Sequence, residues 1–233
     1  MDLAMSSDGA IMVVSAPTEY VGSNTNVGSV YVYAKDNLNG NWVFKQRIRP
    51  ATASNSNNGT KISLDSTGKY LLITSNSAPT YNVHLYVKQT TGEFIYVNSL
   101  SFNESPFIKV NNAGIIYIGL PNDSTNSAQN GLVKRYTIYE TGTNYSIGYG
   151  TTIPCPVNRP YARFGAAIDV PGGDQNAVFI SAPGINLETD NSTFSGGVYR
   201  FFDTGTGPTV THTVRLPDAS PYYYNLGENI VVS

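Results

Sequence analysis

Residues 11–17 read IMVVSAP, and after a polar loop residues 28–33 read GSVYVY. Far downstream, residues 177–183 read AVFISAP and residues 196–202 read GGVYRFF. An apolar run that ends in Ser-Ala-Pro is thus followed twice by a polar loop and by Gly-x-Val-Tyr. Self-similarity of this kind indicates a repeat architecture, and it has to be recognised before single strands or helices are assigned.

Two weaker copies of the same pattern lie between these stretches. Residues 70–75 read YLLITS and lead to VHLYV at residues 83–87. Residues 115–121 read IIYIGLP and lead to GLVKRYTI at residues 131–138. The chain therefore holds several copies of one unit, with their parts in the same order.

Each copy is flanked by two further segments. A short apolar segment precedes the apolar run, and the turn between them contains Asp or Asn close to Gly, at residues 8–9, 65–68, 111–114 and 172–174. These residue types tolerate the positive φ angles of a tight hairpin. After the Tyr-rich segment comes a fourth segment of alternating polarity, which is typical of a strand, at residues 42–48, 93–100, 145–153 and 210–216.

A four-strand antiparallel unit repeated every ~40 to 60 residues is typical of the blades of a β-propeller. No window of the sequence has convincing helical periodicity. We therefore predict an all-β chain that forms a β-propeller of about four four-stranded antiparallel blades. A β-sandwich or barrel is the alternative, but it gives no reason for Ser-Ala-Pro and Gly-x-Val-Tyr to repeat in register. The predicted single domain covers residues 1–233, with blades at 1–58, 59–105, 106–162 and 163–225 and an extra strand at 226–233.

The two ends of the chain leave the size of the ring open. Residues 226–233 read LGENIVVS and look like another first strand, comparable to FGAAIDV at residues 164–170. Either this strand completes the first blade of a small closed ring, or the chain is a fragment of a larger propeller. We see no signal peptide and no apolar stretch near ~18 residues, so we expect no insertion into a membrane.

The composition argues against several classes of protein. Charged residues make up 13% of the chain, well below the roughly 25% of ordinary proteins. The formal net charge is −2 and no run of Lys or Arg occurs, so we expect no nucleic acid among the partners. Cys155 is the single cysteine, which excludes an internal disulfide and a multi-cysteine metal site.

One stretch resembles a known repeat. Residues 164–169 read FGAAID and are followed by VFISAP at 178–183 and GVY at 197–199. This order resembles the FG-GAP repeat of integrin α-chain propellers and of many bacterial and viral surface proteins. The first copy starts too late to contain Phe-Gly, and the second and third copies keep only fragments of the motif. The resemblance implies a β-propeller exposed on a virion or a cell.

In the FG-GAP family, the hairpin between the first two strands often carries a calcium loop of alternating aspartates. Calcium requires six to eight oxygen ligands from a short, sharply turned segment. In this sequence only Asp169 and Asp174 fit that pattern, and the acidic residues between them are missing. The resemblance therefore implies at most a weak calcium site at these two residues, and we expect no other cofactor.

No complete catalytic set is visible in the sequence. His84 lies within an alternating strand, where we expect a packed or edge histidine, and His212 lies at an exposed strand position. We therefore predict that the chain is not an enzyme and assign no catalytic residue. The alternative is a carbohydrate-active propeller enzyme of the glycosidase or sialidase type, which needs only two carboxylates. These would converge at the channel mouth from the polar loops, which contain Glu19, Asp123, Glu188 and Asp190.

The loops after the Pro residues are the better candidates for function. They cover residues 18–27, 122–130 and 184–195, at the same position of each repeat, so we expect them to share one face. We predict a non-enzymatic binding or structural module on a virion, fibre or cell exterior. It would bind other protein subunits, as a component of a larger assembly, or a surface glycan or receptor. The expected contacts are loop residues that include Glu19, Tyr20, Asn122, Asp123, Glu188 and Asp190.

Overall fold

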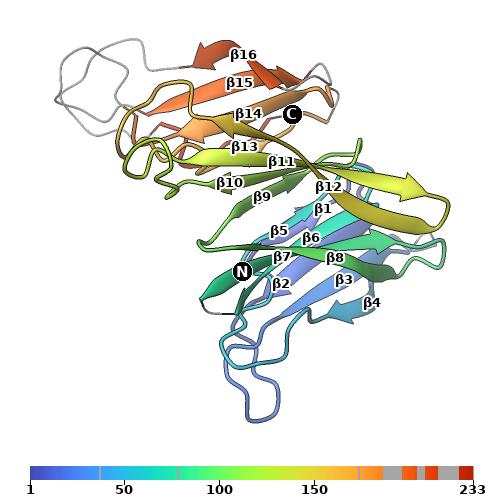
Figure 1. Ribbon diagram of the computed structural model, residues 1–233. Coiled ribbons are helices and arrows are strands. Elements are labelled where there is room, and N and C mark those ends of the chain that lie inside the picture. The colour runs from blue at the N-terminus through green and yellow to red at the C-terminus, as the bar shows by residue number, and fades with distance from the viewer. Residues whose placement is uncertain are drawn as a thin grey trace. The chain divides into compact units, whose positions relative to one another are not determined.

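The protein is an all-β chain. The computed structural model describes residues 1–36, 38–77, 79–172, 174–185, 196–203, 208–214 and 226–232. These residues form four four-stranded antiparallel sheets and no helix (Figure 1). Within these ranges there is accordingly no helix of the length and apolarity needed to cross a membrane. The prediction of an all-β chain with four four-stranded blades is confirmed.

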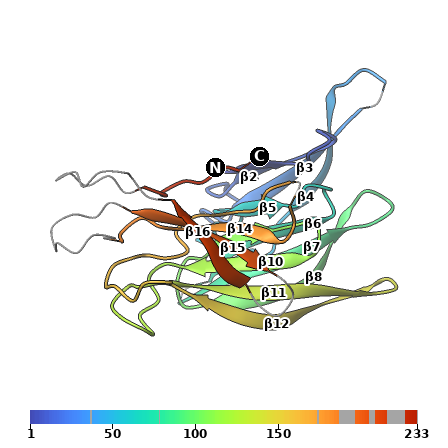
Figure 2. The same ribbon diagram turned by 90° about the horizontal axis from the view of Figure 1, so that it is seen from above.

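In every sheet the strands neighbour one another in chain order. Figure 2 shows this arrangement for β5 to β8, which lie side by side. The first sheet contains β1 (Leu3–Met5), β2 (Ile11–Ala16), β3 (Ser29–Lys35) and β4 (Trp42–Ile48). The second contains β5 (Ile62–Leu64), β6 (Tyr70–Ser77), β7 (Thr80–Lys88) and β8 (Phe94–Phe102). The third contains β9 (Phe107–Val110), β10 (Ile115–Leu120), β11 (Leu132–Thr141) and β12 (Asn144–Pro154). The fourth contains β13 (Ile168–Asp169), β14 (Ala177–Ala182), β15 (Gly197–Asp203) and β16 (Pro208–Val214).

The chain divides into two compact units, which are residues 1–114 with 138–147 and residues 115–137 with 148–233. Each unit has an apolar core of its own. The core of the first unit comes from the first two sheets and contains Ile11, Val13, Val30, Val32, Ile48, Ile62, Leu64, Leu71, Ile73, Tyr86 and Phe94. The core of the second unit includes Tyr117, Val133, Phe164, Val178, Ile180, Tyr199 and Phe201.

The Asp and Asn residues of the hairpins act as turn formers, as predicted. Gly9 has a φ of 65° and donates its backbone N–H to the carbonyl of Ser6 at 2.9 Å. Gly68 donates its backbone N–H to the carbonyl of Asp65 at 3.0 Å, and the carboxylate of Asp65 accepts the backbone N–H of Tyr70 at 2.6 Å. These turns connect β1 to β2 and β5 to β6 through local hydrogen bonds.

The third and fourth strands share an irregularity that marks the repeat. A β-bulge interrupts the ladder between Val32 and Tyr33, between Leu85 and Tyr86, and between Arg200 and Phe201. These positions are equivalent, because Val30, Val83 and Val198 pair with Ser15, Thr74 and Ser181 of the second strands. These three copies therefore share the pairing register of their third and fourth strands as well as their sequence pattern.

Burial differs between inner and outer strands more than the sequence predicts. Five of the six residues of β14 are buried, whereas every residue of β16 is exposed or half-buried. The fourth strand of each sheet has a neighbour on one side only. Its side chains therefore reach solvent from both faces, and its alternating sequence does not produce alternating burial.

At two junctions, a glycine of one repeat pairs with the residue that starts the next repeat. Gly131 pairs with Phe164 and Gly196 pairs with Leu226 through parallel bridges. A Cβ atom on Gly131 would lie 2.3 Å from the carbonyl oxygen of Phe164, so only glycine permits this approach. Leu226 thus takes the place that Phe164 takes one repeat earlier, as expected, although residues 226–232 form no strand of their own.

Candidate active site

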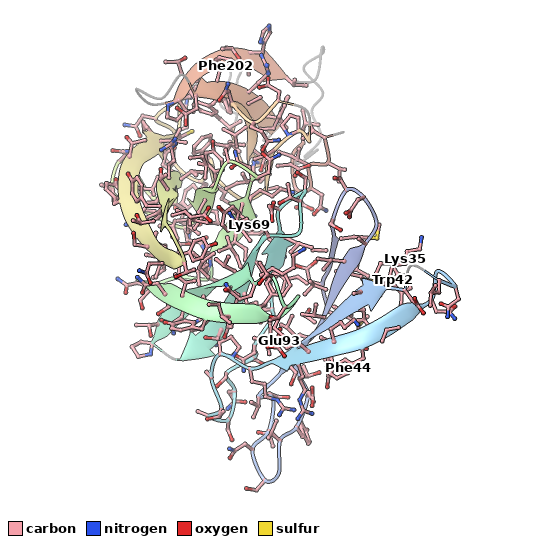
Figure 3. All side chains as sticks on the ribbon, turned by 90° about the vertical axis from the view of Figure 1, so that its right-hand side faces the viewer. Lys35, Trp42, Phe44, Lys69, Glu93 and Phe202 are labelled. Atoms are coloured by element: carbon pink, nitrogen blue, oxygen red, sulfur yellow. The ribbon has the colours of Figure 1, made fainter. Side chains whose placement is uncertain are left out.

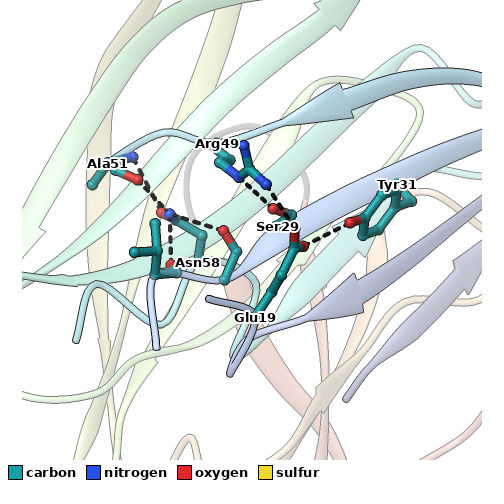
Figure 4. A network of polar contacts seen from close by, with 8 residues as sticks. Glu19, Ser29, Tyr31, Arg49, Ala51 and Asn58 are labelled. Atoms are coloured by element: carbon teal, nitrogen blue, oxygen red, sulfur yellow. Dashed lines mark hydrogen bonds and ion pairs between the residues drawn. The ribbon is translucent and has the colours of Figure 1, made fainter. Parts of the chain in front are cut away.

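Glu19 belongs to a polar network of the first sheet (Figure 4). Its carboxylate accepts Nη2 of Arg49 at 2.6 Å on one oxygen and the hydroxyl of Tyr31 at 2.6 Å on the other. Nε of Arg49 donates to the hydroxyl of Ser29 at 2.6 Å. Both carboxylate oxygens are therefore occupied by protein donors.

The electrostatics of this network keep Glu19 ionised. Burial acts to raise the pKa of Glu19, but the hydrogen bonds of Tyr31, Ser29 and Arg49 outweigh it and hold the pKa below its usual range. The hydrogen bond to Glu19 in turn raises the pKa of Tyr31. A carboxylate in this state fixes the loop to the sheet and is unsuited to act as a general acid at neutral pH.

The loop residues predicted with Glu19 have different surroundings. Glu19 and Asp123 occupy the same position of their repeats, because Gly28 and Gly131 donate their N–H groups to the two backbone carbonyls at 3.0 Å. The carboxylate of Asp123 accepts the N–H of Thr125, as in a local turn. Tyr20 is 66% exposed, and the carbonyl of Asn122 accepts the hydroxyl of Ser124. Two further predicted residues, Glu188 and Asp190, lie outside the described residues.

The predicted calcium ligands both have protein partners. One carboxylate oxygen of Asp169 accepts the backbone N–H of Val232 at 2.7 Å. One carboxylate oxygen of Asp174 forms an ion pair with Nη2 of Arg200 at 3.1 Å. Among the described residues, no group of three or more His, Cys, Asp or Glu side chains is placed to hold a metal ion. Calcium at Asp169 and Asp174 stays a prediction.

A pair of residues that the sequence analysis did not join lies in the second sheet. Oγ of Ser75 on β6 is 2.8 Å from Nε2 of His84 on β7. Ser75 pairs with Asn82 and His84 pairs with Ile73 in the ladder, so the two side chains lie on one face, two positions apart. Both residues are buried, with exposed fractions of 2% for Ser75 and 9% for His84.

Ser75 lines a pocket of about 360 Å³ within the first unit. The pocket wall comes from the loop after β2, the connection before β5, the end of β6, the start of β7 and the segment before β9. Its described lining residues are uncharged and mostly carry hydroxyl or amide groups: Pro17, Thr18, Asn57, Thr60, Thr74, Ser75, Asn76, Tyr81 and Ser105. Oδ1 of Asn76 is buried there and has no hydrogen-bond partner.

Burial fixes the protonation state of His84. Burial disfavours the charged ring and lowers the pKa of His84 to about 4. His84 is therefore neutral at pH 7, and with its proton on Nδ1 its Nε2 accepts the Ser75 hydroxyl. A serine hydroxyl bonded to a neutral histidine beside a pocket is the arrangement of an activated nucleophile.

The sequence contains only a weak signal for this pair. His84 was expected to be a packed histidine, and it is packed, but its partner lies nine residues away across a hairpin. Only the register of β6 against β7 brings the two side chains together. The available signal was a histidine and a serine on the two strands of a predicted hairpin, with both side chains on the same face of the sheet.

No protein-family model and no curated protein matches the sequence. Among solved structures, the chain is similar to the periplasmic gluconolactonase PpgL of Pseudomonas aeruginosa, with a TM-score of 0.60 and 16% identity over 93% of this chain. Other similar structures are a eukaryotic initiation factor, with a TM-score of 0.49, 14% identity and 93% of this chain covered, and a putative 6-phosphogluconolactonase of Bacteroides fragilis, with a TM-score of 0.44, 14% identity and 91% covered. The chain spans 57%, 43% and 70% of these three structures.

These findings show a β-propeller fold, as predicted from the repeats. They also correct the functional prediction. A non-enzymatic binding or structural module was expected, but the propeller with a TM-score of 0.60 is an enzyme, so the predictions of a non-enzymatic role and of no enzyme are wrong. The physical reason is that the sequence analysis considered carboxylates of the polar loops and did not join Ser75 to His84, which meet only through the pairing of β6 with β7. None of the three structures is an FG-GAP protein, and that resemblance stays a prediction.

Proposed function

We propose that this chain carries a hydrolase site for lactones of sugar acids, with Ser75 as the nucleophile and His84 as its general base. The observation that carries the proposal is the 2.8 Å distance between Oγ of Ser75 and Nε2 of His84 at the wall of an uncharged polar pocket. The likeness of the fold to a gluconolactonase supports the choice of substrate class.

The chemistry of such a site follows from the pair. Ser75 Oγ attacks the carbonyl carbon of the lactone while its proton passes to Nε2 of His84. The bond between the carbonyl carbon and the ring oxygen breaks, and His84 returns the proton to that oxygen. Water then attacks the resulting ester, and its proton passes through His84 to Ser75 Oγ as the ester bond breaks. The products are a hydroxy acid and free enzyme, so lactone and water are consumed in equal amounts.

The pocket wall supports a polyhydroxylated substrate. A buried acceptor without a partner costs about 1–3 kcal/mol, and Oδ1 of Asn76 is such an acceptor. A substrate hydroxyl that donates to it would remove this cost. Since the described wall carries no charged side chain, it offers no cation to hold a phosphate group, which favours an unphosphorylated sugar lactone.

The loop carboxylates predicted for a carbohydrate-active enzyme have no role in the proposed reaction. Both oxygens of Glu19 are held by Arg49 and Tyr31, and Asp123 is engaged in a local turn. We propose a location outside the cytoplasm, for which the support is the likeness to a periplasmic protein. A place on a virion surface, partner subunits and a bound surface glycan stay predictions without support from the comparisons.

The test is hydrolysis of D-glucono-1,5-lactone by the purified chain, measured as acid release above the uncatalysed rate. We expect Ser75→Ala and His84→Gln to lower kcat/KM by about 10²–10⁴-fold while the melting temperature stays within a few degrees. Ser101→Ala is the matched control, because Ser101 is an exposed serine of the same sheet whose hydroxyl bonds Asn82. The proposal fails if wild type does not exceed the uncatalysed rate or if Ser75→Ala keeps full activity.

A further inference from the structure

A second pocket of the first unit, here called the lysine pocket, has a volume of about 590 Å³. It lies apart from Ser75, between turns of the first two sheets. Its wall is formed by the β1–β2 turn, the end of β3, the start of β4 and the β7–β8 turn. The volume lies in the range of small-molecule sites, about 300–1,000 Å³.

Three lysines from three different segments line this pocket, namely Lys35, Lys45 and Lys88. The structure gives none of the three an ion pair within the part of the chain that it describes. Two carboxylates, Asp8 and Glu93, also line the pocket, so one positive charge remains. One oxygen of Asp8 is already held by the Ser6 hydroxyl at 2.6 Å and the Ala10 N–H at 2.9 Å. Figure 3 labels Lys35 and Glu93, which come from hairpins of neighbouring sheets.

The β-bulge of the first sheet directs one of these lysines. Val32 pairs with Gln46 and Tyr33 pairs with Phe44, so Lys45 is the extra residue of the bulge. Bulges re-aim a side chain and are common beside functional sites. At the equivalent bulges the extra residues are Val97 and Thr211. A cation at this position is therefore a feature of the first sheet and not of the repeat.

The walls of the pocket are held at a fixed separation. Gln46 follows Lys45, and its amide donates to the carbonyl of Phe94 at 2.9 Å and accepts the N–H of Phe94 at 2.8 Å. This double hydrogen bond joins β4 of the first sheet to β8 of the second. This contact fixes β4 beside the start of β8 next to the pocket, and a wall held in place lowers the entropy lost when a ligand binds.

The floor of the pocket is apolar. It contains Ile11 and Val32, whose side chains are buried in the core of the first unit. An apolar floor below lysine side chains suits a ligand that has one charged end and one apolar end.

We propose that the lysine pocket binds a small organic carboxylate whose charged group meets the lysines and whose apolar ring or chain covers the floor. The single net positive charge matches a carboxylate better than a doubly charged phosphate. The ammonium groups supply point charges, and the apolar floor supplies the hydrophobic contribution. This site is independent of the lactone site, because it shares no lining residue with it.

The probe is 8-anilinonaphthalene-1-sulfonate, an aromatic anion whose fluorescence rises in apolar surroundings. We expect Lys45→Gln and Lys88→Gln each to weaken its binding by about two- to fivefold and the double variant by about tenfold. Arg47→Gln is the matched control, because it removes one positive charge from β4 at a residue outside the pocket lining. Binding that is equal in wild type and the double variant, or a loss in Arg47→Gln as large as in Lys45→Gln, overturns the proposal.

Competition against the dye tests the class of ligand. We expect benzoate to displace it at lower concentration than benzyl alcohol, which lacks the charge, and than sodium phosphate at matched ionic strength, which lacks the ring. Equal displacement by benzyl alcohol would remove the role of the lysines. Equal displacement by phosphate would remove the role of the apolar floor. Either result contradicts an organic carboxylate site.

Discussion

Oγ of Ser75 lies 2.8 Å from Nε2 of His84, and both residues are buried in the second sheet, where Ser75 lines a polar pocket. Burial keeps the imidazole of His84 uncharged at neutral pH.

The pH dependence of lactone hydrolysis should report His84. The acid limb of kcat/KM gives the pKa of the free enzyme's base, and burial lowers the pKa of His84 to about 4. We expect activity to be kept from pH 7 down to about pH 5 and to be half lost near pH 4. A pH-stat series measures this profile, and an acid limb near pH 6.5 would contradict the assignment of His84 as the base.

Folding stability should change over the same pH range. The folded pKa of His84, about 4, lies below its unfolded value of 6.5, so between these values the unfolded chain binds more protons. The stability that depends on neutral His84 is thus complete above pH 6.5 and is lost as the pH falls toward 4. The loss amounts to about 3 kcal/mol.

His84→Gln removes the titrating group and gives the reference for that loss. Urea unfolding at pH 7 and pH 4 should show a smaller drop in the free energy of unfolding for His84→Gln than for wild type. Identical drops in the two proteins would mean that His84 titrates at its ordinary pKa.

Gly131→Ala should be strongly destabilising. Gly131 has a φ of 77°, and a Cβ atom there would lie 2.3 Å from the carbonyl oxygen of Phe164. We expect a loss of about 3 kcal/mol or more, from the positive φ together with the clash. Gly142→Ala is the matched control, because its φ is 63° and no atom lies within 4 Å of the added carbon. It should cost only about 1–2 kcal/mol, and thermal unfolding of both variants compares them.

Two equivalent hydrogen bonds join neighbouring first strands and should differ in strength. Asp169 accepts the N–H of Val232 at 2.7 Å, and Ser63 accepts the N–H of Val110 at 3.1 Å. Hydrogen bonds to charged groups contribute about 1.5–3 kcal/mol and those to neutral groups about 0.5–1.5 kcal/mol. We expect Asp169→Ala to destabilise more than Ser63→Ala and to speed amide exchange of residues 226–232. A larger effect of Ser63→Ala would reverse this ranking.

Much of the fold is readable in the sequence because the relevant interactions are local. Asp65 and Gly68 form their hairpin turn through hydrogen bonds within a few residues, so the residue types alone predict the turn. The repeated Ser-Ala-Pro and Gly-x-Val-Tyr patterns predict the repeated unit, because they recur along the chain in the same order. Phe164 and Leu226 are each followed by a glycine, and each pairs with a glycine of the preceding repeat, Gly131 and Gly196 respectively. The two residues therefore occupy equivalent places.

The candidate sites were decided by tertiary structure. Glu19 and Arg49 are 30 residues apart, and nothing in either segment indicates that they pair. Lys45 enters its pocket because a bulge shifts the register of β4 by one residue. Ser75 meets His84 because β6 and β7 pair in one particular register, and a slip of one residue would turn one of these side chains to the opposite face. The repeats and their turns depend on neighbours along the chain, so residue types and spacing are enough to predict them. Register, burial and the neutral state of His84 depend on neighbours across the sheet, and only the folded chain brings those together.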